Sequence, residues 1–307
     1  MKRQFIASAA QLGPVQLCDS REHTLQRLIR LLDDAADQGA ELIVFPELAL
    51  TTFFGHWYIE DDAELRSFYE KDMPSENTQP LFDAAQRRGV SFVLGFAEET
   101  PEGRLFNSSV LIDEAGTEVL RYRKIHLPGF VDVQPDAAHQ NLEKRYFEVG
   151  DLGFQVAPWH SSTVGLLICN DRRWPESYRV LALQGAELVC LGYNTPAVTP
   201  HLPETDALVD FHNHLSMQAG AYQNSVWVIG TAKAGVEEGV DQIGGSAIVA
   251  PSGEILARAT TKEDELVIAE IDLDMASRYR KDIFSFSQHR RPEHYGLISQ
   301  SQVLNVR

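Results

Sequence analysis

The 307-residue sequence contains only three cysteines, and none of them belongs to a CxxC pair. This spacing suggests neither a zinc ribbon nor a disulfide framework, and free thiols fit a reducing cytoplasm. Basic residues are also scarce, because 27 lysines and arginines stand against 44 acidic residues and leave a formal net charge of -17. With so few cations we expect neither a nucleic-acid-binding face nor a polybasic membrane surface.

Long apolar runs are absent as well, so no segment is predicted to cross a bilayer. The start, MKRQFIASAA, only faintly has the pattern of a signal peptide, and Gln11, Gly13 and Pro14 interrupt it, so we expect a first strand and a cytoplasmic protein. A GxSxG elbow, a phosphate loop, a dinucleotide glycine fingerprint and HExxH are missing. The histidines of DFHNH at 210–214 point to different sides of a helix, so we expect no metal and no cofactor.

Strand and helix patterns alternate along the chain. A capping box at Asp19–Glu22 predicts the start of an amphipathic helix that Gly39 ends, and a second helix is predicted from Pro175 to Gly185. Further helices are predicted over 78–88, 205–223 and 274–281. Strands are predicted over 4–10, 41–45, 90–97, 109–112, 119–122, 188–191, 225–231, 246–249, 254–257 and 266–271.

Hairpins therefore mix with strand–helix–strand units, which predicts an α/β protein with mixed sheets and helices on their outer faces. No glycine- or proline-rich linker divides the chain, so we expect a single domain over 1–307. The segments at the ends of two predicted helices are nearly identical: QGAELIVF from Gln38 and QGAELVCL from Gln184. Such a short match arises either by chance or from two related α/β halves.

Cys169 ends the apolar run at 164–168, and NDRRWPE follows it. Because Pro175 is a preferred first helical residue, the thiol is expected at a strand end and close to a helix start. Helix N–H groups and nearby cations lower the pKa of a thiol, and the thiolate is the nucleophile. A buried structural cysteine is the alternative reading of Cys169. For Cys18, in a loop, and Cys190, in an apolar strand, a structural role is the expectation.

Two more charged residues stand at strand ends. Glu47 follows the strand predicted over 41–45, where α/β sheets bind ligands, and partial burial would suit it to general-base catalysis. Lys124 stands at the end of the strand in RYRKIH. Taken singly, each also fits an ordinary capping or surface charge. Together with Cys169, they can supply the nucleophile, the proton shuttle and the oxyanion stabilisation of an acyl-transfer enzyme.

With this trio the chain resembles the nitrilase superfamily, and within it most of all the N-carbamoyl-D-amino acid amidohydrolases. The matching segments are FPELALTTFF, YRKIHLPG, LEKRYFEVGDLGF, ICNDRRWPE, GYNTP, LSMQAGAYQN and HYGLI, which span nearly the whole chain. The resemblance implies a four-layer αββα sandwich that forms homodimers or homotetramers. It also implies hydrolysis of N-carbamoyl-D-amino acids to the D-amino acid, carbon dioxide and ammonia through a cysteine thioester, without a cofactor.

The resemblance also implies a role for each matching residue. Glu47 matches the general base, Lys124 the oxyanion-side lysine and Cys169 the nucleophile. Glu143 matches a second glutamate that supports the lysine and the substrate. Arg172 and Arg173 match the pair that holds the substrate carboxylate, with Asn170 and Asn194 as polar contacts nearby. His126 matches the family histidine after the lysine, and we expect it and Asn141 to bind substrate as well.

The arginines also have a physical rationale. A planar guanidinium holds a carboxylate with two parallel hydrogen bonds, which suits a small-molecule substrate that bears a carboxylate. The alternative for Arg172 and Arg173 is pairing with the protein's many acids. Asn141 is a departure, because the family typically has histidine immediately before LEKRYFE. An asparagine can hydrogen-bond there, but it cannot change its charge near neutral pH.

Other functions stay open from the residues alone. The first is a related C–N hydrolase that acts on a different carboxylate-bearing amide, a simple amide, a nitrile or a carbamoyl amine. The second is a non-catalytic binding protein on the same scaffold, and the third is a metal-dependent hydrolase. A substrate panel, alkylation of the thiol without turnover, and inhibition by chelators distinguish these functions.

Overall fold

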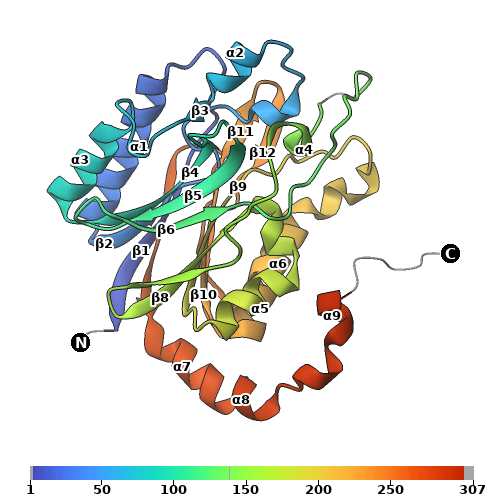
Figure 1. Ribbon diagram of the computed structural model, residues 1–307. Helices are drawn as coiled ribbons and strands as arrows, with labels where there is room; N and C mark the ends of the chain where they lie inside the picture. The colour runs from blue at the N-terminus through green and yellow to red at the C-terminus, as the bar shows by residue number, and fades with distance from the viewer. Residues whose placement is uncertain (1–2, 138, 301–307) are drawn as a thin grey trace.

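Two β-sheets lie face to face at the centre of the computed structural model, which describes residues 3–137 and 139–300 (Figure 1). The ends of the predicted domain, 1–2 and 301–307, lie outside the described residues. The first sheet has the strand order β15-β1-β2-β4-β5-β6, with β3 beside β4. Its strands are β1 (Gln4–Gln11), β2 (Ala40–Val44), β3 (Tyr69–Glu70), β4 (Ser91–Glu99), β5 (Leu105–Ile112), β6 (Glu118–Arg123) and β15 (Glu265–Asp272).

The second sheet has the order β14-β13-β10-β9-β8-β7, and a separate hairpin joins β11 to β12. These strands are β7 (Val156–Trp159), β8 (Ser162–Ile168), β9 (Leu188–Tyr193), β10 (Trp227–Ala232), β11 (Ala234–Glu237), β12 (Val240–Ile243), β13 (Ala247–Val249) and β14 (Ile255–Arg258). The hairpin was not predicted, because its short strands carry buried polar residues in place of an alternating apolar pattern.

Helices form the outer layers. The helices α1 (Arg21–Asp37) and α3 (Gln79–Arg88) pack on the first sheet, and α5 (Pro175–Leu183) and α6 (Val209–Asn224) cover the second (Figure 1). This confirms the predicted four-layer αββα arrangement. The remaining helices are α2 (Asp62–Arg66), α4 (Glu143–Tyr146), α7 (Leu273–Asp282), α8 (Phe286–His289) and α9 (Gly296–Gln300). Within residues 3–137 and 139–300, every helix is too short or too polar to span a membrane.

Local signals explain most element ends. The N-cap of α1 is Ser20, whose hydroxyl accepts from the His23 N–H at 3.1 Å. The predicted capping box at Asp19 was therefore wrong by one residue, since the Asp19 carboxylate accepts from Gln16 N–H instead. Gly39 has a left-handed φ of 85° just after α1, as predicted. The predicted helix over 205–223 begins as α6 only at Val209, because a 3-10 turn precedes it.

The two repeated sequences occupy equivalent places. The first repeat forms β2, which lies between β1 and β4 and is parallel to both. The second forms β9, which lies between β8 and β10 and is likewise parallel to both. Gly39 and Gly185, with φ of 85° and 99°, precede these strands. This equivalence favours two related halves over a chance match.

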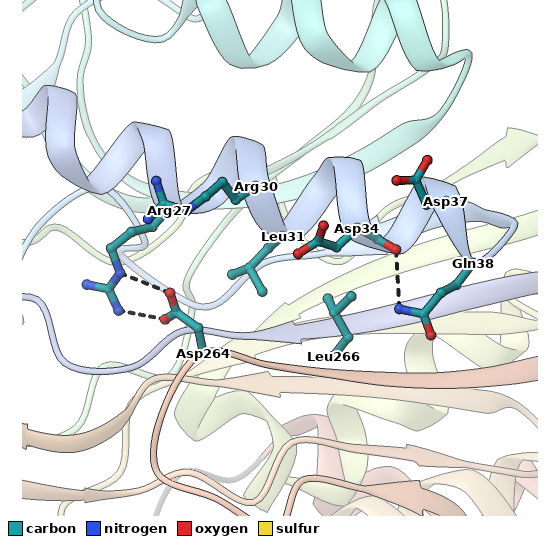
Figure 2. A pocket seen from close by; sticks show the side chains of 8 residues that line it. All are labelled: Arg27, Arg30, Leu31, Asp34, Asp37, Gln38, Asp264 and Leu266. Atoms are coloured by element: carbon teal, nitrogen blue, oxygen red, sulfur yellow. Dashed lines mark hydrogen bonds and ion pairs between the residues drawn. The ribbon is translucent and has the colours of Figure 1, made fainter.

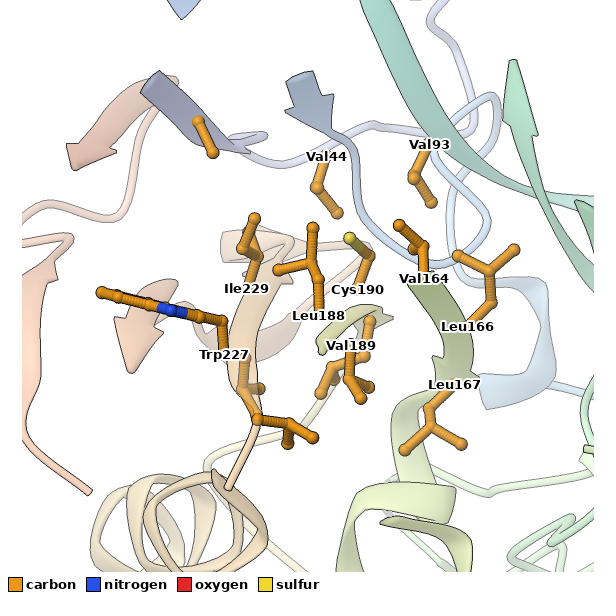
Figure 3. Packing of buried hydrophobic residues seen from close by; sticks show 14 of the residues in the cluster. Val44, Val93, Val164, Leu166, Leu167, Leu188, Val189, Cys190, Trp227 and Ile229 are labelled. Atoms are coloured by element: carbon orange, nitrogen blue, oxygen red, sulfur yellow. The ribbon is translucent and has the colours of Figure 1, made fainter. Parts of the chain in front are cut away.

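The inner faces of the sheets form one apolar core. Val44 and Val93 of the first sheet meet Val164 and Leu188 of the second (Figure 3). Cys190 lies in this core as a free thiol, and burial raises its pKa, which confirms its structural role. Cys18 is exposed. The core therefore fixes the positions of the carboxyl ends of β2 and β9.

Two glycines let the chain after β2 pass between the sheets. A Cβ on Gly95 of β4 would lie 2.5 Å from the Pro46 carbonyl oxygen, and a Cβ on Gly192 of β9 would lie 2.3 Å from the Glu47 nitrogen. Contacts this short are not tolerated, so only glycine fits at either position without a shift of the backbone. The backbone of Glu47 is thereby clamped between β4 and β9.

The exchange Gly192→Ala is expected to destabilise the protein, because the added methyl group must displace the backbone of Pro46 and Glu47. Overpacking of this kind costs about 1–3 kcal/mol, and urea unfolding should show a loss of that size. The matched control is Gly296→Ala, where a methyl group meets only the flexible end of Gln300 at 3.8 Å. Equal stability of the two variants would contradict the clamp.

Candidate active site

The predicted catalytic residues converge at neighbouring strand ends. Glu47 follows β2, Lys124 follows β6, and Cys169 follows β8. Glu143 is the first residue of α4, and Asn194 follows β9. All five side chains are buried, and hydrogen bonds join four of them directly. The structure thus brings together residues that are far apart in the sequence.

Lys124 is the centre of this cluster. Its Nζ donates to Glu47 Oε1 at 2.7 Å and to Glu143 Oε2 at 2.5 Å, and its side chain has no exposed surface. Burial by itself lowers the pKa of Lys124, but the negative groups of Cys169, Glu143 and Glu47 outweigh it and raise that pKa above its ordinary value. The lysine is therefore a fixed positive charge beside the thiol at any physiological pH.

Both sheets hold the carboxylate of Glu47. From the first sheet, Asn107 Nδ2 donates to Oε1 at 2.8 Å. From the second, the backbone N–H and Nδ2 of Asn194 donate to Oε2 at 2.9 and 3.1 Å. With the bond from Lys124, each oxygen accepts two donors, which fixes the orientation of the carboxylate. Asn107 was not predicted, although a polar residue in a buried strand was a signal for it.

Cys169 occupies a strained turn. It is the first residue of the 3-10 turn Cys169–Arg173, and its φ is 47°, in the left-handed region that residues with a side chain rarely adopt. Such strain persists only where the surroundings impose it, and it gathers at functional sites. The thiol donates to the Asn194 carbonyl oxygen at 3.2 Å. Burial and the Glu47 carboxylate raise the pKa of this thiol, whereas Lys124 and Arg172 lower it.

Glu143 joins the cluster to a cavity. Burial raises its pKa to about 7, since the Lys124 ammonium offsets only part of that effect and the Glu47 carboxylate adds to it. Its Oε1 is buried without a hydrogen-bond partner among the described residues, and Glu143 lines the cavity. A substrate N–H donor would satisfy this oxygen. Asn141, also in the cavity wall, accepts from the Glu143 N–H at 3.1 Å.

The cavity has a volume of about 950 Å³ and contains Cys169 in its wall. Its polar lining includes Glu143, Asn194 and Arg173, and its apolar lining includes Val198 and Leu202. Another hollow, of about 570 Å³, lies between α1 and β15, and it is lined by none of the predicted site residues (Figure 2). In residues 3–137 and 139–300, no cluster of three or more His, Cys, Asp or Glu side chains could hold a metal ion.

The two arginines have different environments. Arg172 is 1% exposed, and its guanidinium donates to the Cys169 carbonyl at 2.7 Å, to Thr195 Oγ1 at 2.8 Å and to Asn213 Oδ1 at 3.0 Å. It also lies over the ring of Tyr193, at 4.4 Å from the centroid. These contacts favour a role in holding the nucleophile turn over the predicted contact with a substrate carboxylate.

Arg173, in contrast, lines the cavity and reaches its solvent. Within the described part of the chain its guanidinium makes no hydrogen bond or ion pair. Although Arg173 reaches solvent, the protein around its guanidinium and the neighbouring Arg172 charge lower its pKa to about 10, so it remains a cation at neutral pH. The structure does not support the alternative that Arg173 pairs with an acidic residue of this protein. Arg173 is therefore a free cation beside the thiol.

Asn170 and His126, which were predicted to contact the substrate, are not among the residues that line the cavity and bond instead around the turn Cys169–Arg173. The Asn170 amide donates to the His126 carbonyl at 3.0 Å. His126 Nδ1 bonds Asp171 Oδ1 at 2.8 Å, and its ring stacks on Trp174. Asp171, which was not predicted, also accepts from Tyr122 and from the Ile168 N–H. This network favours a role for these residues in bracing the turn.

A buried thiol, two carboxylates and an ammonium at this spacing can perform acyl transfer. The thiolate is the attacking group, a carboxylate moves its proton, and the ammonium stabilises an oxyanion. The thiol bonds to a carbonyl in the resting structure and not to Glu47. Catalytic hydrogen bonds are often completed only when substrate binds.

The exchange Arg172→Met is expected to raise the pKa of the Cys169 thiol, because it removes a positive charge that favours the thiolate. The pH at which iodoacetamide alkylation of Cys169 is half-maximal should therefore rise. For each pH unit of that rise, alkylation at pH 7 should be about tenfold slower. Arg173→Met, which leaves the turn contacts in place, should move the profile less. A larger move in Arg173→Met would contradict the assignment.

Comparison with known proteins gives the family. The carbon-nitrogen hydrolase family matches residues 6–281. A nitrilase of Pyrococcus abyssi is 34% identical over 267 residues, which cover 87% of this chain and 90% of that protein. An N-carbamoylputrescine amidase of Arabidopsis thaliana is 30% identical over 310 residues, which cover 97% and 96%.

The fold leads to the same group. The crystal structure of a carbon-nitrogen hydrolase from Helicobacter pylori G27 is similar with a TM-score of 0.84 and 26% identity, and the match covers 97% of this chain and 99% of that one. The superfamily expected from the motifs is confirmed, whereas the D-amino acid substrate stays a prediction. With 276 consecutive residues, 6–281, matching its family, this chain belongs to the carbon-nitrogen hydrolases.

Proposed function

We propose that this carbon-nitrogen hydrolase cleaves the carbamoyl C–N bond of N-carbamoyl-D-amino acids. The observation that carries the proposal is Arg173, a free cation in the same cavity as Cys169 and Glu143. An N-carbamoyl amino acid has a reactive carbonyl carbon and, two bonds beyond its nitrogen, a carboxylate that a guanidinium can hold. The D configuration rests on the resemblance of the NDRRWPE segment to D-specific amidohydrolases.

In the first half of the reaction, Glu47 takes the proton of Cys169 and the thiolate attacks the carbamoyl carbon. Lys124 and a backbone N–H stabilise the oxyanion that forms on the carbonyl oxygen. A positioned proton transfer contributes about 10²–10⁴-fold to the rate, and an oxyanion donor contributes about 3–4 kcal/mol. Glu47 then returns the proton to the departing nitrogen, the C–N bond breaks, and a thioester remains on Cys169.

In the second half, Glu47 takes a proton from one water molecule, and the hydroxide attacks the thioester. The thiolate leaves and regains its proton. Hydrolysis of the thioester gives a carbamic acid, whose remaining C–N bond breaks when it loses carbon dioxide. Over both halves one water is consumed, and the products are the amino acid, carbon dioxide and ammonia. The unpartnered Oε1 of Glu143 would accept an N–H of the carbamoyl group during these steps.

Arg173 explains why the substrate would be an anion. N-carbamoylputrescine, the substrate named for the Arabidopsis relative, ends in an amine that is protonated at neutral pH. A free guanidinium in the cavity repels such a group and attracts a carboxylate. A different carboxylate-bearing amide or carbamoyl compound is the alternative that the same cation would accept.

A substrate panel tests the proposal directly. We expect ammonia release from N-carbamoyl-D-methionine, and much less from its L form and from N-carbamoylputrescine. Cys169→Ala should abolish release while thermal unfolding stays unchanged, because the thiol is the nucleophile. EDTA is the control for a metal-dependent hydrolase. Release from the L form alone would overturn the stereochemical assignment, and activity in Cys169→Ala would overturn the mechanism.

The exchange Arg173→Met is expected to raise KM for the carbamoyl amino acid at least tenfold, because a charge-assisted contact to the carboxylate is lost. The rate constant kcat should change less, since Arg173 does not touch the reacting carbon. N-carbamoyl-D-methioninamide, which has no carboxylate, is the matched substrate, and its KM should not rise. An equal rise for both substrates would show that Arg173 supports the cavity and does not hold the carboxylate.

A further inference from the structure

A second buried ion pair lies outside the catalytic cluster. Lys233 follows β10, and Glu237 is the last residue of β11. Lys233 Nζ donates to Glu237 Oε1 at 2.7 Å, and the two side chains are 0% and 1% exposed. Burial lowers the pKa of Lys233, and the charges of Glu237 and Glu47 oppose that effect. The mechanism above uses neither residue, so this buried pair requires another explanation.

The pair holds the loop that leaves the general base. We call residues 48–56 the base loop, because it begins directly after Glu47. Lys233 Nζ donates to the Thr51 carbonyl at 2.7 Å. Glu237 accepts from the Phe53 N–H and, at 3.2 Å, from Thr52 Oγ1. Three consecutive residues of the base loop are thus bound to one ion pair.

The base loop in turn holds the segment that carries Glu143. The Gly55 carbonyl accepts from Leu142 N–H at 2.8 Å, and the His56 carbonyl accepts from Gln140 N–H at 2.9 Å. The His56 ring, which is buried, bonds the Gln140 carbonyl through Nδ1 and accepts from the Gln242 amide through Nε2. The base loop therefore links the two carboxylates that flank Lys124, and Phe53 and His56 also line the cavity.

We propose that Lys233 and Glu237 are positioning residues that set the geometry of Glu47 and Glu143 through the base loop. Apolar side chains could fill the same space, but they cannot bind the carbonyl and N–H groups of residues 51–53, which lie outside any helix or strand. A carboxylate accepts several donors at once, and the ammonium beside it balances its charge. The proposal rests on the catalytic roles assigned above, and not on the identity of the substrate.

The deciding variant is Lys233→Met with Glu237→Gln. Removal of both charges leaves no unpaired charge in the interior, so the expected loss of stability is limited to that of the Thr51 carbonyl, which loses its donor. If the pair only supported folding, activity would be kept. We expect kcat on N-carbamoyl-D-methionine to fall at least tenfold while the thermal unfolding temperature falls only slightly. A kcat within threefold of the unaltered protein would overturn the proposal.

Arg27 and Asp264 provide the matched control pair. They form a 2.6 Å ion pair between α1 and the start of β15, and neither bonds the base loop (Figure 2). Arg27→Met with Asp264→Asn should lower the unfolding temperature at least as much as the deciding variant and leave kcat within twofold. A kcat loss in the control as large as in the deciding variant would overturn the proposal.

Two further measurements keep the test decisive. Thr52→Val removes one contact of Glu237 and keeps the side-chain shape, so kcat should fall about threefold without a change in unfolding temperature. If the double variant fails to fold, this variant decides, and an unchanged kcat overturns the proposal.

Alkylation of Cys169 separates the proposal from the substrate assignment. Measured by iodoacetamide at pH 7 in a Cys18→Ser background, it should be several-fold slower in the double variant, because Glu47 no longer takes the thiol proton in the same geometry. If the unaltered protein hydrolyses none of the carbamoyl substrates, the proposed function fails and alkylation alone decides. Equal alkylation rates would then overturn the positioning role.

Discussion

The buried ammonium of Lys124 is the constraint on which the site depends. An isolated charge in the interior is too costly to keep, so a buried lysine requires carboxylates close to it. Here two carboxylates surround one ammonium, and the cluster carries either a net negative charge or one additional proton. Burial is the main reason that the pKa of Glu143 is raised to about 7, and the excess negative charge adds to it. It also means that the cluster by itself would repel an anionic substrate.

The two arginines after the nucleophile offset that repulsion in different ways. Arg172 is buried behind Cys169, where its charge favours the thiolate and its hydrogen bonds hold the left-handed turn. Arg173 faces the cavity, where its charge is available to the substrate. Under the proposed function, one charge thus acts on the Cys169 thiol and the other on the ligand. Adjacent residues in a tight turn point in different directions, which allows NDRRWPE to serve both needs.

The sequence predicted the strand ends, the trio of Glu47, Lys124 and Cys169, and the layered fold. Local residue patterns and short motifs are enough to indicate these features. It did not predict the partners that fix those groups. Asn107 bonds Glu47 across 60 residues, and Glu237 bonds Thr52 across 185. Such contacts depend on how the sheets pack, and no local pattern records that. Arg172 was matched to the substrate for the same reason, since spacing does not show which way a side chain turns.

The active site itself has two parts, a buried cluster between the sheets and a cavity wall made mostly of loops. The reacting groups lie at strand ends between packed sheets, where Gly95 and Gly192 leave no space for the backbone of Glu47 to move. The cavity wall is built largely from residues 128–137, 139–141 and 194–202, which lie outside the helices and strands of the described chain. Loops can change without disturbing the core. Relatives with the same fold can therefore differ in substrate, and in this chain Arg173 is the residue at that boundary that we propose to select the ligand by its charge.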